Sequence, residues 1–144
     1  MATLAQKLGL REGQRICLLD APDAAVGLLR AVLAPATELD TALGDGRYDL
    51  IFLWPTTADG LAGRFAALQR RIPPEGAIWA VLPKRAVARR RGIALTWETM
   101  QAAALTTALV DNKIATLTDE DYGTRFVIRK ERRGAYAGEL WRTS

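Results

Sequence analysis

The sequence predicts an α/β fold with a mainly parallel sheet, on three observations. Short apolar runs bounded by turn residues recur along the chain, and such runs are typical of strands buried on both faces. Amphipathic segments with helical spacing alternate with these runs, which indicates β-α-β units and a parallel sheet. Two strand-like segments near the C-terminus are separated only by the acidic turn Asp119-Glu120-Asp121, which predicts a terminal antiparallel hairpin.

The composition is that of an ordinary globular protein. Of the 144 residues, 49% are hydrophobic and 25% are charged, with a net charge of +4. We expect one domain over residues 1–133 and a tail over 134–144, whose Tyr136 and Trp141 would contact the domain or a second subunit. No apolar run approaches the ~20 residues of a membrane span, and the N-terminus does not resemble a signal peptide. With a single cysteine, Cys17, no intramolecular disulfide can form, and we expect a cytoplasmic protein.

The chain contains no histidine. This absence excludes Ser-His-Asp and Cys-His catalysis as well as metal sites built on histidine. Cys17 lies within the apolar run 15–20, where a buried thiol behaves as a small hydrophobic side chain rather than as a nucleophile. We therefore expect neither a catalytic set nor a metal site.

The N-terminal half predicts two helices and three strands. Strands are expected at 15–20, weakly at 37–39, and most clearly at 48–54; helices are expected at 3–8 and from 23 to about 34. Asp23 is predicted to cap the second helix, and Pro35 to end it.

The C-terminal half continues the alternation. After Pro55 a helix is expected, because Leu61, Phe65, Leu68 and Ile72 share one face at helical spacing. Further elements follow in the order strand 77–82, basic loop 84–91, helix 96–109, and hairpin strands 113–117 and 124–130. Thr96 is predicted to cap the last helix.

This order of elements resembles the second half of class I S-adenosylmethionine-dependent methyltransferases, over residues 12–130. In that family a helix ends in a proline-glycine turn such as Ile72-Pro73-Pro74-Glu75-Gly76 before the fifth strand. The resemblance implies a Rossmann-like three-layer sandwich. Asp20 then matches the acidic residue that precedes the family's glycine-rich loop, and Asp40 matches the ribose-binding acid after the second strand.

The chain departs from the family where the cofactor would bind. The three glycine positions are Pro22, Ala24 and Val26, and side chains there would crowd a ligand that needs close backbone approach. A capping carboxylate at Asp23 would also fill the anion site at the start of the helix. The interval before Tyr48 leaves little room for the family's usual third strand. We therefore expect no cofactor, with S-adenosylmethionine as the alternative.

Several segments are also similar to a bacterial family of small proteins of unknown function. They are residues 8–15, Ala21-Pro22, Leu82-Pro83-Lys84, 109–113 and 123–127. This second resemblance implies no activity.

Ligands of open parallel sheets bind beyond the carboxyl ends of the strands. A small-molecule or anion site is therefore predicted from Asp20, Asp40, Trp54, Thr56, Lys84 and Arg85. Arg89, Arg90 and Arg91 in the basic loop could neutralise phosphates, although no aromatic residues interleave with them and a solvated loop is the alternative.

Three hypotheses of function remain. The first, which we favour, is a non-catalytic binding or interaction module that self-associates, on a degenerate methyltransferase-like fold. The second is an S-adenosylmethionine-dependent enzyme with an atypical cofactor loop. The third, which we favour least, is weak nucleic-acid association through the 84–91 loop. We expect no membrane partner.

Overall fold

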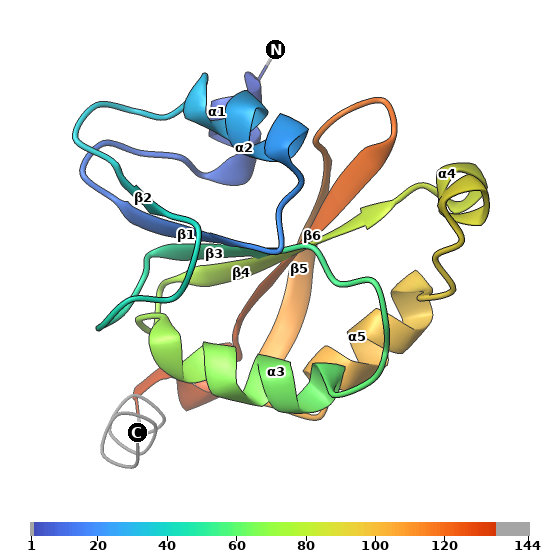
Figure 1. Ribbon diagram of the computed structural model, residues 1–144. Coiled ribbons are helices and arrows are strands. Elements are labelled where there is room, and N and C mark those ends of the chain that lie inside the picture. Colours follow the sequence, from blue (N-terminus) through green and yellow to red (C-terminus); the bar gives the residue numbers. More distant parts are fainter. Residues whose placement is uncertain (1, 135–144) are drawn as a thin grey trace.

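The computed structural model describes residues 2–134, and its centre is a six-stranded sheet (Figure 1). The strands are β1 (Arg15–Leu19), β2 (Glu38–Asp40), β3 (Leu50–Leu53), β4 (Ala77–Pro83), β5 (Leu109–Thr116) and β6 (Asp121–Ile128). They lie in the order β2-β1-β3-β4-β6-β5. The first four are parallel, whereas β6 runs antiparallel to both β4 and β5. The predicted parallel sheet with a C-terminal hairpin is confirmed.

Helices cover both faces of the sheet. The helices are α1 (Leu4–Leu8), α2 (Asp23–Arg30), α3 (Leu61–Leu68), α4 (Arg85–Arg91) and α5 (Trp97–Leu105), with short 3-10 turns η1 (Gln69–Arg71) and η2 (Lys130–Arg132). In Figure 1, α1 and α2 lie on one side of the sheet, α3 and α5 lie on the other, and α4 projects beyond the end of β4. This is the predicted three-layer arrangement.

Two apolar clusters fill the space between the sheet and its helices. On the α2 side, the rings of Phe52 and Trp79 stack with centroids 6.1 Å apart. On the α3 side, Phe65 packs against Phe126 of β6 at 5.5 Å. Every residue of β3 is buried, because both of its faces meet a helical layer. This explains why β3 appears in the sequence as a continuous apolar run rather than as an alternating one.

The chain changes direction across the sheet at β1. The connection through α2 places β2 on one side of β1, and the next segment returns to place β3 on its other side. The point between β1 and β3 is therefore the topological switch point, where sheets of this type bind ligands. Residues 41–49 connect β2 to β3 without forming a strand or helix, as the short interval before Tyr48 predicted.

The predicted basic loop over 84–91 is wrong, because most of it forms the helix α4. Alanine and arginine have high helix propensity, and Gly92 ends the helix in the left-handed conformation at φ 69°. The loop interpretation gave too much weight to charge and too little to propensity.

The two predicted helix caps have different outcomes. Thr96 caps α5, and its hydroxyl accepts a hydrogen bond from the Thr99 amide at 3.2 Å. Asp23 does not cap α2: it is the first helical residue, and Pro22 occupies the cap position without a side-chain hydrogen bond.

Several boundaries also differ from the sequence-based expectation. The hairpin strands begin earlier than predicted, at Leu109 and Asp121, with a register irregularity between Asp111 and Lys113. The predicted contacts of Tyr136 and Trp141 lie outside the described residues. Within residues 2–134, no helix has both the length and the apolar character needed to cross a membrane.

Candidate functional site

A cavity of about 880 Å³ opens at the carboxyl edge of the sheet, beside the switch point between β1 and β3. Its size falls within the range of small-molecule sites. The lining comes from the ends of β1, β3 and β4, the first turns of α2, the end of α4 and the β5–β6 turn: Asp20, Pro22, Ala24, Ala25, Leu28, Trp54, Pro55, Thr56, Val81, Pro83, Arg91, Ile93, Thr118, Asp119, Glu120 and Asp121. We call this the switch-point cavity.

The turn after β1 is formed without a glycine. Asp20 adopts the left-handed conformation, with φ 59°, which aspartate tolerates better than most non-glycine residues. Its carboxylate makes an ion pair with the Arg64 guanidinium of α3 at 2.7 Å, across a partly exposed site. The chain can therefore turn from β1 into α2 while Pro22 and Ala24, rather than glycines, face the cavity.

The first turn of α2 borders the switch-point cavity through Pro22, Ala24 and Ala25. No side chain caps this helix, so its first amide groups are not occupied by the Asp23 carboxylate. The sequence-based objection that Asp23 fills this anion site therefore falls. Pro22 and Ala24 do put side chains where the related family has glycines, but both are small, and a cavity remains between them and β3.

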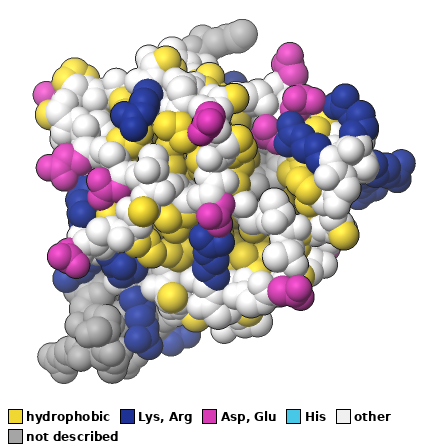
Figure 2. Space-filling model, in the orientation of Figure 1, with side chains coloured by type: hydrophobic (Ala, Val, Ile, Leu, Met, Phe, Trp, Pro, Cys, Tyr) yellow, Lys and Arg dark blue, Asp and Glu magenta, His cyan; other side chains and the backbone are white. Residues whose placement is uncertain are grey.

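The end of β3 supplies an aromatic wall. Trp54 is 9% exposed and packs against Phe52 with ring centroids 6.3 Å apart, which fixes the indole at the cavity surface. Thr56 follows Pro55 on the exposed rim. Figure 2 shows hydrophobic side chains in the middle of this face, between α2 and α4.

The opposite wall is held together by charge. Glu120 receives a hydrogen bond on its carbonyl from the Lys84 amide at 2.8 Å, and its carboxylate pairs with Arg90 at 2.9 Å and Arg91 at 3.3 Å. Arg91 also pairs with Asp121 at 3.1 Å. These contacts join α4 to the β5–β6 turn, where Figure 2 shows basic and acidic side chains gathered together.

The lining carries more negative than positive charge. Four carboxylates face the cavity, those of Asp20, Asp119, Glu120 and Asp121, against the single guanidinium of Arg91. Three of the four are paired with arginines, whereas Asp119 makes no hydrogen bond or ion pair within residues 2–134. A ligand with positive charge and several hydroxyl groups suits such a lining.

The structure brings together only part of the predicted site. Asp20, Trp54 and Thr56 line the switch-point cavity, but Lys84 is the exposed cap residue of α4 and lies outside the lining. Of the basic residues, Arg91 reaches this cavity and Arg90 is held by Glu120. Arg85 and Arg89 face a second cavity instead, on the other side of α4.

Asp40 does not reach the site. It pairs with Cys17 in the middle of β1, so β2 ends short of the sheet edge that Asp20 occupies. Its carboxylate accepts a hydrogen bond from the Tyr48 hydroxyl at 2.6 Å and is 3.4 Å from the Arg15 guanidinium. The predicted grouping of Asp40 with Asp20 is therefore corrected, because strand register separates them.

Sequence reasoning did not place Asp119 in the lining of the switch-point cavity, nor Tyr122 in that of the second cavity. Both belong to a hairpin that returns to β4, and nothing local in the sequence indicates that return. The helix propensity of residues 85–91 could have predicted α4, which contributes to the walls of both cavities.

The thiol of Cys17 takes no part in either cavity. It is buried inside β1, and this burial, assisted by the nearby Asp40 carboxylate, raises the pKa of the thiol to about 11. No group of His, Cys, Asp and Glu side chains in the described part of the chain is arranged to hold a metal ion.

Comparison with solved structures shows a methyltransferase-like fold. A SAM-dependent methyltransferase from Aquifex aeolicus matches with a TM-score of 0.64 and 11% identity, covering 87% of each chain. Fibrillarin from Aeropyrum pernix, solved with natively bound S-adenosyl-L-methionine, matches at 0.56 and 12% identity, over 82% of this chain and 67% of that one. The N-methyltransferase NodS from Bradyrhizobium japonicum, solved with S-adenosyl-L-homocysteine, matches at 0.55 and 14% identity, over 88% and 84%.

These neighbours correct the expectation that no cofactor binds, since two of the three carry S-adenosylmethionine or its demethylated product. No protein-family model matches the sequence, and no curated protein is similar to it. The similarity to a bacterial family of small proteins therefore stays a prediction.

Proposed function

We propose that the chain binds S-adenosylmethionine in the switch-point cavity and acts as a methyltransferase-like enzyme with an atypical cofactor loop. The observation that carries the proposal is the place of the cavity: it lies at the carboxyl ends of β1 and β3, at the switch point of a sheet shared with methyltransferases. The same neighbours support this reading better than a non-catalytic module.

The residues at the cavity fit the chemical parts of that cofactor. Trp54, Leu28 and Val81 offer apolar surface for a purine ring, and the acidic lining suits ribose hydroxyls and the positive sulfonium and ammonium groups. The first turn of α2, which has no side-chain cap, can receive a carboxylate. Small side chains at Ala24 and Ala25 leave this approach open.

When bound, S-adenosylmethionine supplies an electrophilic methyl group to a nucleophilic acceptor. The chain itself contributes position and charge. The carboxylates are the only side chains in the cavity lining that can act as a base, so a proton leaving an acceptor would go to one of them. Asp119 is suited to that role, because it faces the cavity and forms no ion pair with any described residue.

Calorimetric titration of the full chain with S-adenosylmethionine and with S-adenosylhomocysteine tests the proposal. We expect saturable heat for both ligands. Ala24→Trp places an indole in the cavity and should abolish the binding heat. Ala31→Trp changes an exposed position just past the other end of α2 and should leave binding unchanged. No heat at millimolar ligand, or equal binding by the two variants, would overturn the assignment.

A further inference from the structure

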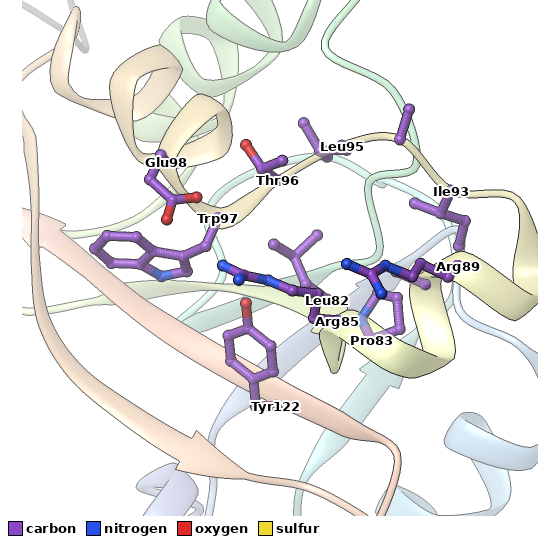
Figure 3. A pocket seen from close by; sticks show the side chains of 12 residues that line it. Leu82, Pro83, Arg85, Arg89, Ile93, Leu95, Thr96, Trp97, Glu98 and Tyr122 are labelled. Carbon is purple, nitrogen blue, oxygen red and sulfur yellow. The ribbon is translucent and has the colours of Figure 1, made fainter.

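A second cavity, of about 370 Å³, lies on the far side of α4 from the switch-point cavity (Figure 3). It is enclosed by α4, the segment that leads into α5, the end of β4 and the start of β6. The two cavities share only Pro83 and Ile93 in their linings, so the second one is a separate compartment. We call it the α4–α5 cavity.

We propose that the α4–α5 cavity binds a small aromatic monocarboxylate, held by Arg85 and Arg89. This inference goes beyond the proposed function and does not depend on it. Four features of the cavity support it: the unpaired guanidinium groups on one wall, the aromatic groups on the other, the charge balance of the lining and the volume.

Arg85 and Arg89 are four residues apart on α4, so they lie on one face of the helix. Neither guanidinium group makes an ion pair or hydrogen bond within the described residues, although those of Arg90 and Arg91, next along the helix, are both paired with Glu120. Two like charges at this spacing repel each other. An anion between them would relieve that repulsion, and a carboxylate matches the planar guanidinium in two-point hydrogen bonding.

The opposite wall is aromatic and held in place. Trp97 donates its indole N–H to the Thr124 hydroxyl at 2.9 Å, so the cavity meets its ring rather than its polar atom. Leu82 and Leu95, which are both buried, add apolar surface to the lining. Figure 3 shows Arg85 and the hydroxyl of Tyr122 turned toward the same part of the cavity, next to Trp97. An aromatic body is the group that stacks on such a wall.

The Tyr122 hydroxyl can donate a hydrogen bond to a bound anion. Burial first, and then the Glu98 carboxylate, raise the pKa of Tyr122 above its ordinary value, against the opposing effect of Arg85. The phenol therefore keeps its proton throughout the neutral range. No described residue accepts that proton in a hydrogen bond, so the donor is available.

The net charge of the lining favours a monoanion. Arg85 and Arg89 carry two positive charges and Glu98 one negative charge, which leaves a single positive charge in excess. A carboxylate balances that excess, whereas a dianionic phosphate would meet Glu98 with an uncompensated negative charge. The volume lies at the low end of small-molecule sites, which excludes a polymer inside the cavity.

The test follows the indole N–H resonance of Trp97 in the ¹⁵N-labelled full chain, assigned with Trp97→Phe. Benzoate, phenylacetate and 3-phenylpropionate are titrated without S-adenosylmethionine, so the result is independent of cofactor binding. We expect saturable shifts that the corresponding amides do not cause. Arg89→Gln should weaken binding about tenfold, since a charge-assisted hydrogen bond is lost.

Arg90→Gln is the matched control, because it removes the same charge one position along, at a side chain that pairs with Glu120 outside this cavity. Binding to this variant should be unchanged. Equal loss in the two variants, equal binding of benzamide and benzoate, or tighter binding of phenyl phosphate than of the carboxylates would each overturn the proposal. So would the absence of any shift at millimolar probe.

Discussion

The Tyr48 hydroxyl donates a 2.6 Å hydrogen bond to the Asp40 carboxylate, and this pair ties β2 to the segment that leads into β3. The same hydroxyl accepts from the Gly44 amide at 2.7 Å, and the Arg15 guanidinium lies 4.1 Å from the centre of the Tyr48 ring. Arg15 also donates to the carbonyl of Asp45. Residues 41–49 have no regular structure of their own, so these side chains hold them in place.

Tyr48→Phe should destabilise the protein by about 1–3 kcal/mol, because the Gly44 amide loses its acceptor and the Asp40 carboxylate loses its shortest hydrogen bond. Urea denaturation monitored by circular dichroism measures the loss. Tyr122→Phe is the control: the Tyr122 hydroxyl makes no hydrogen bond within the described residues, so removing it should cost much less. Equal effects would contradict the role of the Tyr48 hydroxyl.

Stability should fall at alkaline pH because of Cys17. Burial raises the pKa of its thiol from 9.0 to about 11. The thiol of the unfolded chain ionises at a lower pH than that of the folded chain. Between pH 9 and pH 11 the unfolded state therefore binds fewer protons, and raising the pH favours it over the folded state. The contribution is intact below pH 9 and is lost as the pH rises toward 11.

Denaturation midpoints measured at a series of pH values test this prediction. Cys17→Ala should lower stability below pH 9, because it leaves space in the core, yet flatten the decline that begins near pH 9. Burial also raises the pKa of Tyr48 above its ordinary value of 10.0, so ionisation of this phenol causes a separate fall in stability above pH 10.0. An unchanged slope between pH 9 and 10 in the variant would contradict the assignment to the thiol.

Gly123→Ala should destabilise the protein by about 1–3 kcal/mol, the usual effect of overpacking. A methyl group there would come within 2.9 Å of the Trp79 ring and 3.1 Å of Leu117. Gly27→Ala has the opposite expected sign, since Gly27 lies in α2 with open space around it, and alanine favours a helix by about 1 kcal/mol. Thermal unfolding of the two variants should therefore shift in opposite directions, and shifts in the same direction would contradict this packing.

The chain should not retard DNA or RNA at moderate salt. Arg90 and Arg91 are occupied by Glu120 and Asp121, which neutralise much of the basic segment. The double variant Glu120→Gln with Asp121→Asn frees both arginines and should introduce weak, salt-sensitive retardation. Strong retardation by the unaltered chain, abolished by changing Arg89, Arg90 and Arg91 to glutamate, would instead support the nucleic-acid hypothesis.

Local sequence patterns predicted the elements well where one physical cause dominated. The run around Ile51 and Phe52 is apolar throughout because both faces of β3 are covered, and Thr96 caps its helix through a contact three residues away. The same approach failed for residues 85–91, where charge suggested a loop although alanine and arginine favour a helix.

The candidate site was only partly predictable, because its side chains are brought together by contacts distant in sequence. Asp20 follows its strand directly and reaches the sheet edge, whereas Asp40 was displaced from it by the register of β2 on β1. Arg85 and Arg91 look equivalent in the sequence, yet the helical turn between them directs one to each cavity.

The sequence by itself determined the order of the strands and of every helix except α4, the parallel core of the sheet and the absence of histidine chemistry, because burial and side-chain composition are local properties. Only the tertiary structure decided which charges are paired, that α4 separates two cavities, and that the turn after β1 leaves one of them open at the switch point. Those features depend on strand register and on how the hairpin packs against β4, and such long-range contacts leave no periodic pattern along the chain.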